Sequence, residues 1–319
     1  MKKAALIAVT IMMVLAFNLV VAQESSDVAS APYVTDFAKA KALAAVGDKP
    51  IIIDFYTDWC VWCKKFDKEV ATQPEIIEFF TDDAVYAKIN AEEDTLVSRA
   101  YKVMGFPTFV LTDSKGEEID RIAGYLPTAE FLQTIDDYRN GIGTLGALLE
   151  EAKTKNDREL YFEIANKYKY RGDSKNGKEW YEKIAASGEK QDSLSGEAYL
   201  AIADMYRRED KDDDAMAAYK KIVEDFKGTN FEPRGMLYVG HMNRWGKEFE
   251  TALSIYNTVM AEFKGGEFEE TAEIYRAINY RDKGDTTLAI AAFAGFAEHW
   301  PNSEDFDYAN EQIAKLRGE

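Results

Sequence analysis

The hydrophobic and polar positions follow two different patterns along the chain, and the pattern changes near residue 140. Before that point, short runs of β-branched and aromatic residues alternate with stretches of helical periodicity. A run such as 51–56, Ile-Ile-Ile-Asp-Phe-Tyr, is typical of a strand that is buried on both faces. We expect strands over residues 51–56, 85–90, 108–112 and 118–122.

Helical patterns separate these strands, and the turn Asp113–Gly116 joins the last two into a hairpin. We expect helices over residues 36–46, 60–70, 74–80, 96–103 and 128–138. Alternation of this kind predicts an α/β fold in which a central mixed sheet is flanked by helices.

After Gly141–Gly143 the chain shows only helical periodicity, and it repeats itself. The aromatic residues Tyr181, Tyr219, Tyr256 and Phe293 follow one another at intervals of 38, 37 and 37 residues. A polar turn precedes each of them, at 171–173, 209–211, 245–247 and 283–285. Residues 157–319 are therefore predicted to form about four helical hairpins, after a connecting segment over residues 141–156. Because one hairpin cannot bury its apolar side alone, we expect the aromatic residues to pack between helices rather than to contact a ligand.

The first 22 residues have the pattern of a signal peptide. Lys2 and Lys3 precede an almost wholly apolar run from Ala4 to Val21, and the small residue Ala22 ends it. We expect cleavage before Gln23, a linker over residues 23–32, and a periplasmic or otherwise exported protein without stable membrane insertion after cleavage. The alternative is an uncleaved membrane anchor. No cysteine follows the apolar run, so lipid attachment there is not available.

The charge balance excludes one class of partner. The chain has 39 Lys and Arg against 57 Asp and Glu, a formal net charge of −18. Nucleic-acid binding depends on basic residues that neutralise phosphates, so we expect no nucleic-acid partner.

Both cysteines of the chain lie in one Cys-x-x-Cys motif, where a predicted strand passes into a predicted helix. The N–H groups at a helix N-terminus favour thiolate over thiol at Cys60, which makes it the expected nucleophile. Cys63 lies about one helical turn further on and is the expected resolving thiol. The alternatives are a structural bridge or half of a zinc site, but His241 and His299 lie far away in the repeats. We expect no metal and no cofactor beyond a redox-active Cys60–Cys63 disulfide.

The segment Asp54–Lys64, Asp-Phe-Tyr-Thr-Asp-Trp-Cys-Val-Trp-Cys-Lys, resembles the active-site segment of thioredoxins. It is closer still to the C-terminal thioredoxin-like domain of the bacterial membrane reductant transporter DsbD. Gly105–Thr108 matches the cis-proline loop of that family, and the resemblance covers residues 33–140. It implies a thioredoxin fold, and the repeats that follow resemble tetratricopeptide repeats, although their period is longer than the usual 34 or so residues.

The resemblance also implies roles for individual residues. Asp54 matches a buried carboxylate that relays a proton to or from the resolving cysteine, and Lys88 matches the lysine that pairs with it. Alternatively, both side chains lie in water at strand ends. Pro107, if cis, presents neighbouring backbone to a substrate, with Phe106 beside it.

Two tryptophans flank the motif. Trp59 and Trp62 are expected to form an apolar contact surface for substrates, although partial core packing of at least one of them is the alternative. The pair Val61-Trp62 between the cysteines differs from that of thioredoxins. This difference leaves the direction open between electron donor, oxidant and isomerase.

These observations predict an enzyme, an exported thiol-disulfide oxidoreductase whose repeats recruit the partner. Its partners would be disulfide-containing exported proteins and an upstream protein that donates or accepts thiol electrons. The alternative is an envelope adaptor in which the thioredoxin-like domain is only a docking module. Both cysteines, Asp54 and Pro107 are present, which favours the enzyme.

Overall fold

The computed structural model describes residues 29–187 and 191–319. The predicted signal peptide and its cleavage site lie outside the described residues. By internal contacts the chain forms two compact units. Unit 1 runs to Asn156 and also includes Asn166–Asp173, and unit 2 consists of Asp157–Ala165 and Ser174–Glu319. Within the described parts of the chain, no helix is both long enough and apolar enough to cross a membrane.

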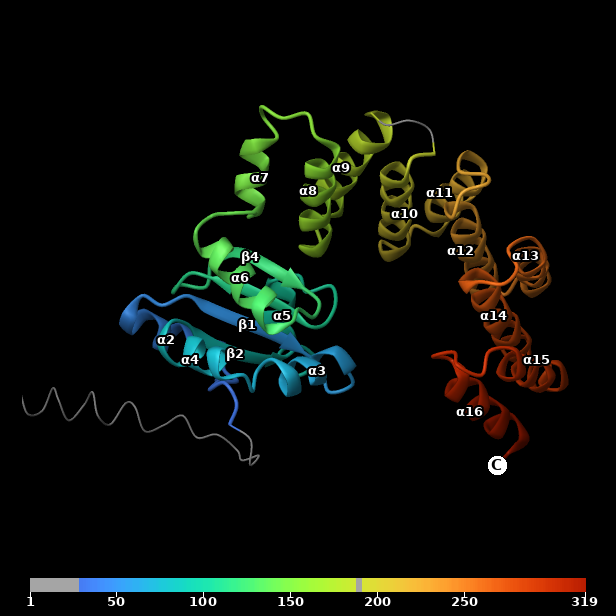
Figure 1. Ribbon diagram of the computed structural model, residues 1–319, viewed down its shortest axis with the longest axis horizontal. Coiled ribbons are helices and arrows are strands. Elements are labelled where there is room, and N and C mark those ends of the chain that lie inside the picture. Colours follow the sequence, from blue (N-terminus) through green and yellow to red (C-terminus); the bar gives the residue numbers. More distant parts are fainter. Residues whose placement is uncertain (1–28, 188–190) are drawn as a thin grey trace, which may run out of the picture. The chain divides into compact units, whose positions relative to one another are not determined.

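Unit 1 is built on a four-stranded mixed sheet (Figure 1). The strands are β1 (Ile51–Tyr56), β2 (Val85–Asn90), β3 (Thr108–Thr112) and β4 (Glu118–Ala123), in the order β2-β1-β3-β4. Strand β1 pairs parallel with β2 and antiparallel with β3, and β3 pairs antiparallel with β4. All four strands lie where the hydrophobic pattern predicts them.

Helices cover both faces of this sheet. One core joins the sheet to α3 (Val61–Glu69), α4 (Pro74–Asp82) and α6 (Thr128–Arg139). The other joins it to α2 (Phe37–Gly47) and α5 (Thr95–Ala100). Strand β1 lies between them, so alternate side chains enter different cores and Asp54 faces the side of α3.

Two local differences from the sequence prediction concern helices. The helix expected over residues 96–103 ends at Ala100, because Lys102 adopts a left-handed backbone conformation with φ of 49°. A short helix, α7 (Leu145–Glu151), lies in the segment expected to be a connection, and the Thr144 side chain caps it.

The remaining chain forms helical hairpins, as predicted. Their helices are α8 (Arg158–Tyr170), α9 (Ser174–Ser187), α10 (Ser193–Arg208), α11 (Asp212–Asp225), α12 (Phe231–Trp245), α13 (Phe249–Glu262), α14 (Glu267–Lys283), α15 (Thr286–His299) and α16 (Phe306–Arg317). Each predicted polar turn joins the two helices of one hairpin, from α8–α9 to α14–α15. The last turn of α8 belongs to unit 1.

The aromatic residues of the repeat form the core of this array. Tyr181, Tyr219, Tyr256 and Phe293 are fully buried on the second helix of each hairpin. The facing helices approach closely, since a Cβ on Gly240 would lie only 2.6 Å from the Tyr256 ring. Packing between helices is therefore the role of these residues, as expected.

Candidate functional site

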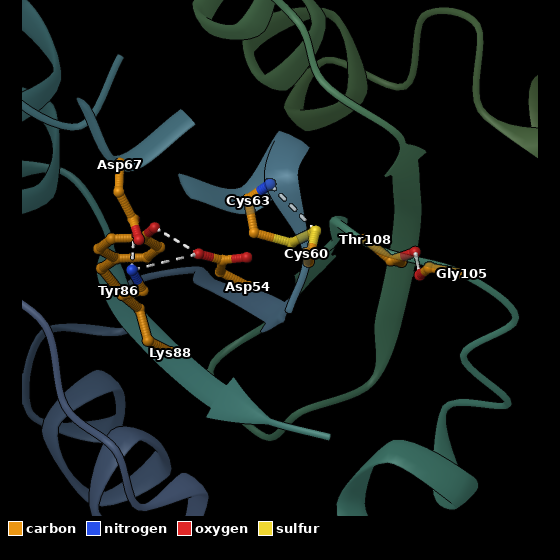
Figure 2. Close-up of a disulfide and its surroundings, with 8 residues drawn as sticks. All are labelled: Asp54, Cys60, Cys63, Asp67, Tyr86, Lys88, Gly105 and Thr108. Atoms are coloured by element: carbon orange, nitrogen blue, oxygen red, sulfur yellow. Dashed lines mark hydrogen bonds and ion pairs between the residues drawn. A yellow bond between two sulfur atoms is a disulfide. The ribbon is translucent and has the colours of Figure 1, made fainter. Parts of the chain in front are cut away.

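The two cysteines form a disulfide where β1 passes into α3. Cys60 is the N-cap residue of α3, and its Sγ accepts a hydrogen bond of 3.0 Å from the Cys63 N–H (Figure 2). This N–H, together with the positive end of the helix dipole, stabilises negative charge on Cys60 once the disulfide is reduced. The arrangement is suited to a reactive thiolate at Cys60.

Asp54 lies on β1 in the interior, with only 2% of its surface exposed. The Tyr86 hydroxyl donates a hydrogen bond of 2.7 Å to Oδ2, whereas Oδ1 is buried without a hydrogen-bond partner. Burial raises the pKa of Asp54 to about 6, although nearby Lys88 and the Tyr86 hydrogen bond act in the opposite direction. In Figure 2 the carboxylate lies between Tyr86 and Lys88 on one side and the two cysteines on the other. Asp54 is therefore a buried carboxylate that changes protonation near neutral pH, not a solvated residue at a strand end.

Lys88 lies opposite Asp54 in the parallel pairing of β1 and β2. Its Nζ is 4.0 Å from Asp54 Oδ2, and it donates a hydrogen bond to Asp67 of α3. Its side chain is largely buried, contrary to the solvated alternative. Burial lowers the pKa of Lys88, but Asp54 and Asp67 outweigh it, so that the pKa is raised and Lys88 stays charged. The expected pair is thus a triad in which Asp67 is the closer partner.

Sequence reasoning missed two of these residues. Asp67 lies four residues after Cys63, which places both on the same face of α3. Tyr86 lies two residues before Lys88 on β2, and so on the same face of the sheet. Both spacings were visible in the sequence, but only the pairing of β1 with β2 brings Tyr86 to Asp54, and only the packing of α3 against the sheet brings Asp67 into the same cluster.

The loop before β3 lies on the side of the disulfide opposite Asp54 (Figure 2). The Phe106–Pro107 peptide bond is cis, the conformation expected from the resemblance. Pro107 is buried and Phe106 is half-buried. The Thr108 hydroxyl donates a hydrogen bond of 2.8 Å to the Gly105 carbonyl, which fixes the loop at its return into β3.

Both tryptophans of the motif are exposed, Trp59 by 64% and Trp62 by 54%. Among the described residues, neither ring belongs to the two buried core clusters of the sheet. The Trp59 ring meets the Phe106 ring edge-on at 5.9 Å between centroids, and its Nε1 donates a hydrogen bond to Glu92. The Trp62 ring lies against Tyr125, with the Lys65 ammonium over both rings. Val61 and Met104 are exposed as well, and we call the exposed side chains of Trp59, Val61, Trp62 and Met104 the aromatic edge.

Over residues 29–187 and 191–319, no group of three or more His, Cys, Asp and Glu side chains is arranged to hold a metal ion. His241 and His299 lie in α12 and α15, and the cysteine sulfurs are joined to each other.

Unit 2 contains a cavity of about 630 Å³ between side chains of α12 and α14. Its walls include Tyr238, Trp245 and Tyr275, with the guanidinium groups of Arg207 and Arg244 next to Trp245. His241 also lines it, and its buried Nδ1 has no hydrogen-bond partner. Burial, then Arg244 and Arg207, lower the pKa of His241 to about 4, so this ring is neutral at pH 7. The cavity combines aromatic walls with polar groups, as ligand sites in proteins commonly do.

Comparison with known proteins agrees with both parts of the fold. Residues 37–139 match the family described as thioredoxin-like domain, and residues 197–229 match the tetratricopeptide repeat. The thiol:disulfide interchange protein DsbD of Yersinia pestis is 35% identical over 101 residues, 30% of this chain and 17% of that protein. This chain thus spans about a sixth of the length of that relative. The oxidised C-terminal domain of Neisseria meningitidis DsbD is 21% identical, with 33% of this chain and 98% of that one covered and a TM-score of 0.30.

A complete small relative decides the family. The thioredoxin of Mycoplasma pneumoniae is 33% identical over 104 residues, which are 32% of this chain and 97% of that protein. Residues 37–139, which match the thioredoxin-like family, contain the sheet, both cysteines and the cis-proline loop described above. Through residues 37–139, which contain the Cys60–Cys63 disulfide, the chain belongs to the thioredoxin family.

Proposed function

We propose that this protein reduces or exchanges disulfides in exported partner proteins, and that its helical repeats recruit those partners. One observation carries the proposal. A disulfide at a helix N-terminus lies beside a buried carboxylate whose pKa is raised to about 6. A purely structural disulfide needs no such carboxylate. A dithiol that gains and loses protons near neutral pH needs a nearby group that can donate and accept them.

Reduction of a partner begins at Cys60. In the reduced enzyme its thiolate, stabilised by the Cys63 N–H and the α3 dipole, attacks one sulfur of the partner disulfide. A mixed disulfide forms between Cys60 and the partner, and the other partner sulfur leaves as a thiolate that takes up a proton.

Resolution needs the thiolate of Cys63. Its thiol gives a proton to the Asp54 carboxylate, and the resulting thiolate attacks Cys60 Sγ. The bond between Cys60 and the partner breaks, the partner sulfur leaves as a thiolate that takes up a proton, and the Cys60–Cys63 disulfide forms, so that two electrons have passed to the partner. An upstream protein dithiol then reduces this disulfide and is itself oxidised to a disulfide, and no further cofactor is needed.

Binding of the partner next to the disulfide is assigned to the aromatic edge and the loop of Phe106 and Pro107. Exposed aromatic side chains bury large apolar areas when a partner covers them. Because Pro107 has no N–H, an extended segment of the partner would pair with the backbone groups of the neighbouring residues in this loop. We assign recruitment of the rest of the partner to the repeats, with the cavity of unit 2 as the candidate contact.

Trapping of mixed disulfides tests the roles of the two cysteines. Cys63→Ser is expected to accumulate partners bound through Cys60, whereas Cys60→Ser is expected to trap none. The two variants remove one sulfur each and serve as matched controls for one another. Equal trapping by both would refute the assignment, and no trapping by either would favour the adaptor.

The equilibrium reduction potential of the cysteine pair tests the direction. A glutathione series with alkylation and mass detection would give a value below about −220 mV for a reductase and above about −150 mV for an oxidant. The same mass spectra, taken on protein from the cell envelope, would show whether Gln23 is the first residue.

The recruiting role of the repeats is tested in the Cys63→Ser background. Trp245→Ala removes an exposed wall of the cavity and is expected to lose selected trapped partners, while reduction of a generic disulfide is retained. Leu288→Ala, on α15 of the same unit, is the matched control, because Leu288 is also an exposed apolar residue and is not among the cavity walls. An unchanged set of trapped partners would show that the cavity does not recruit them.

A further inference from the structure

Strand β4 buries two adjacent charged residues, Asp120 and Arg121, of which Asp120 is fully buried and Arg121 is 5% exposed. Buried charges are costly unless each is paired and hydrogen-bonded. Asp120 is satisfied by Lys167 at 3.1 Å, Arg171 at 2.8 Å and the Leu145 N–H at 2.7 Å. All three partners come from segments after α6, so unit 1 depends on residues well beyond its sheet.

Arg121 joins three segments that are far apart in the chain. Its guanidinium pairs with Glu118 on the same strand and donates hydrogen bonds of 2.9 Å to two backbone carbonyls. One is the carbonyl of Tyr170, the last residue of α8, and the other is that of Tyr101, the residue after α5. The planar fork of arginine suits such a bridge, whereas the single ammonium of lysine does not.

Tyr101 is the first residue of the loop that leads from α5 to the cis-proline. Residues 101–106 include the left-handed Lys102, exposed Met104 and half-buried Phe106. Residues after α8 pack beneath this loop, since a Cβ on Gly172 would lie 3.3 Å from Met104 Sδ and 3.4 Å from Lys102 Cβ. Gly172 has φ of 63°, which favours glycine at this close approach. The loop is thus held by Arg121 and by residues 170–172.

We propose that Arg121 is a positioning residue that, together with residues 166–173, fixes the loop 101–106 and thereby the substrate-binding position of Phe106. This inference rests on the proposed function in taking Phe106 as part of the surface that a partner covers. Residues 166–173 comprise the end of α8 and the turn that joins α8 to α9, so the first repeat hairpin contributes residues to unit 1 itself. Arg121 touches neither cysteine in this arrangement, and its effect is on partner binding rather than on the dithiol.

Two substrates of different size separate these effects in the full-length protein. Arg121→Met is expected to raise the KM for insulin about tenfold with little change in kcat, because the loop that meets a protein substrate is displaced. Reduction of the small disulfide 5,5′-dithiobis(2-nitrobenzoic acid) is expected to stay within about twofold of wild type, because it needs no docked segment. The reduction potential of the cysteine pair is also expected to stay unchanged.

Three further variants make the test specific. Arg121→Lys keeps the charge and the Glu118 pair but loses the fork, and is expected to raise the KM as Arg121→Met does. Gly172→Ala disturbs the loop through its contacts with Lys102 and Met104, and is expected to raise the KM for insulin to a smaller extent. This variant also keeps the test possible if Arg121→Met does not fold. Arg99→Met removes an exposed arginine of the same unit and is expected to change neither substrate.

Amide hydrogen exchange of residues 101–106 follows the loop without any redox reaction. Faster exchange in Arg121→Met supports the inference even if the wild type reduces neither substrate, an outcome that would refute the proposed function alone. Unchanged exchange and unchanged KM would overturn the inference. Equal losses with both substrates would also overturn it, because they would show a general structural role.

Discussion

The two sides of the Cys60–Cys63 disulfide differ in chemistry. On the inner side, polar groups lie in the interior of an α/β fold, where Asp54 contacts both Tyr86 and Lys88. On the outer side, apolar side chains face solvent, with Trp59 and Trp62 both more than half exposed. Burial of apolar surface alone would place apolar side chains inside and polar side chains outside, which is the opposite of what the two sides show.

This difference teaches which property each side controls. Buried polar groups cost stability and shift pKa values, so we expect the inner side to determine proton transfer. Exposed aromatic groups cost little until a partner covers them, so we expect the outer side to determine binding. Substitutions on the two sides are therefore expected to change different kinetic parameters, and the predictions below test this separation.

The largest effect is expected from Asp54→Asn. Asparagine keeps the size and can still accept the Tyr86 hydrogen bond, but it cannot accept the proton of Cys63. We expect kcat for insulin reduction at pH 7 to fall about 100-fold, with KM nearly unchanged. Stopped-flow measurement should show the mixed disulfide accumulating. A rise in KM instead would break the separation between the two sides.

The same variant is expected to stabilise the oxidised protein. The pKa of Asp54 is raised from 3.8 to about 6 on folding, so the folded state holds its proton more tightly than the unfolded state. The free energy of unfolding of the wild type therefore falls as the pH rises from about 4 to about 6. Above that range Asp54→Asn should be more stable by up to about 3 kcal/mol, and below pH 4 the difference should vanish. Urea unfolding at several pH values measures this, and a pH-independent difference would contradict the assignment.

A smaller effect is expected from the outer side. Trp59→Ala removes an exposed aromatic group that meets Phe106, and should raise the KM for insulin about tenfold while kcat stays the same. The matched control is Val46→Ala on α2 of the same unit, which also truncates an exposed apolar side chain. If Trp59→Ala lowered kcat with an unchanged KM, the outer side would take part in the chemical steps.

The smallest effect is expected from Asp67→Asn. The Asp67 charge raises the pKa of Asp54, and Asp67 also holds Lys88 by a hydrogen bond. Without it, the pKa of Asp54 should fall below about 6, both directly and because Lys88 is free to approach Asp54. The pH midpoint of kcat should then move to lower pH. Glu69→Gln, the same charge change on α3, is the control, and an equal shift there would show a general charge effect.

Most of the fold could be predicted from the sequence because burial leaves a local periodic pattern. The strand run 51–56 and the 37-residue spacing of Tyr219 and Tyr256 are properties of neighbouring or regularly spaced residues. The cysteine pair and its place at a helix N-terminus were equally local. The end of α5 at Ala100 was not, because the backbone of Lys102 turns where the loop meets the rest of unit 1.

The sequence by itself determined the elements, the repeat, the reactive cysteines and the identity of the carboxylate beside them. Only the tertiary structure decided the partners of that carboxylate, because they depend on the register between β1 and β2 and on the packing of α3 against the sheet. It also decided that Trp59 and Trp62 face solvent. In the same way, only the folded chain brings Asp120 and Arg121 of β4 into contact with residues 166–173. Hydrophobic pattern is a property of residues close in sequence, whereas pKa values, ion pairs and exposure arise from groups that meet only when the chain folds.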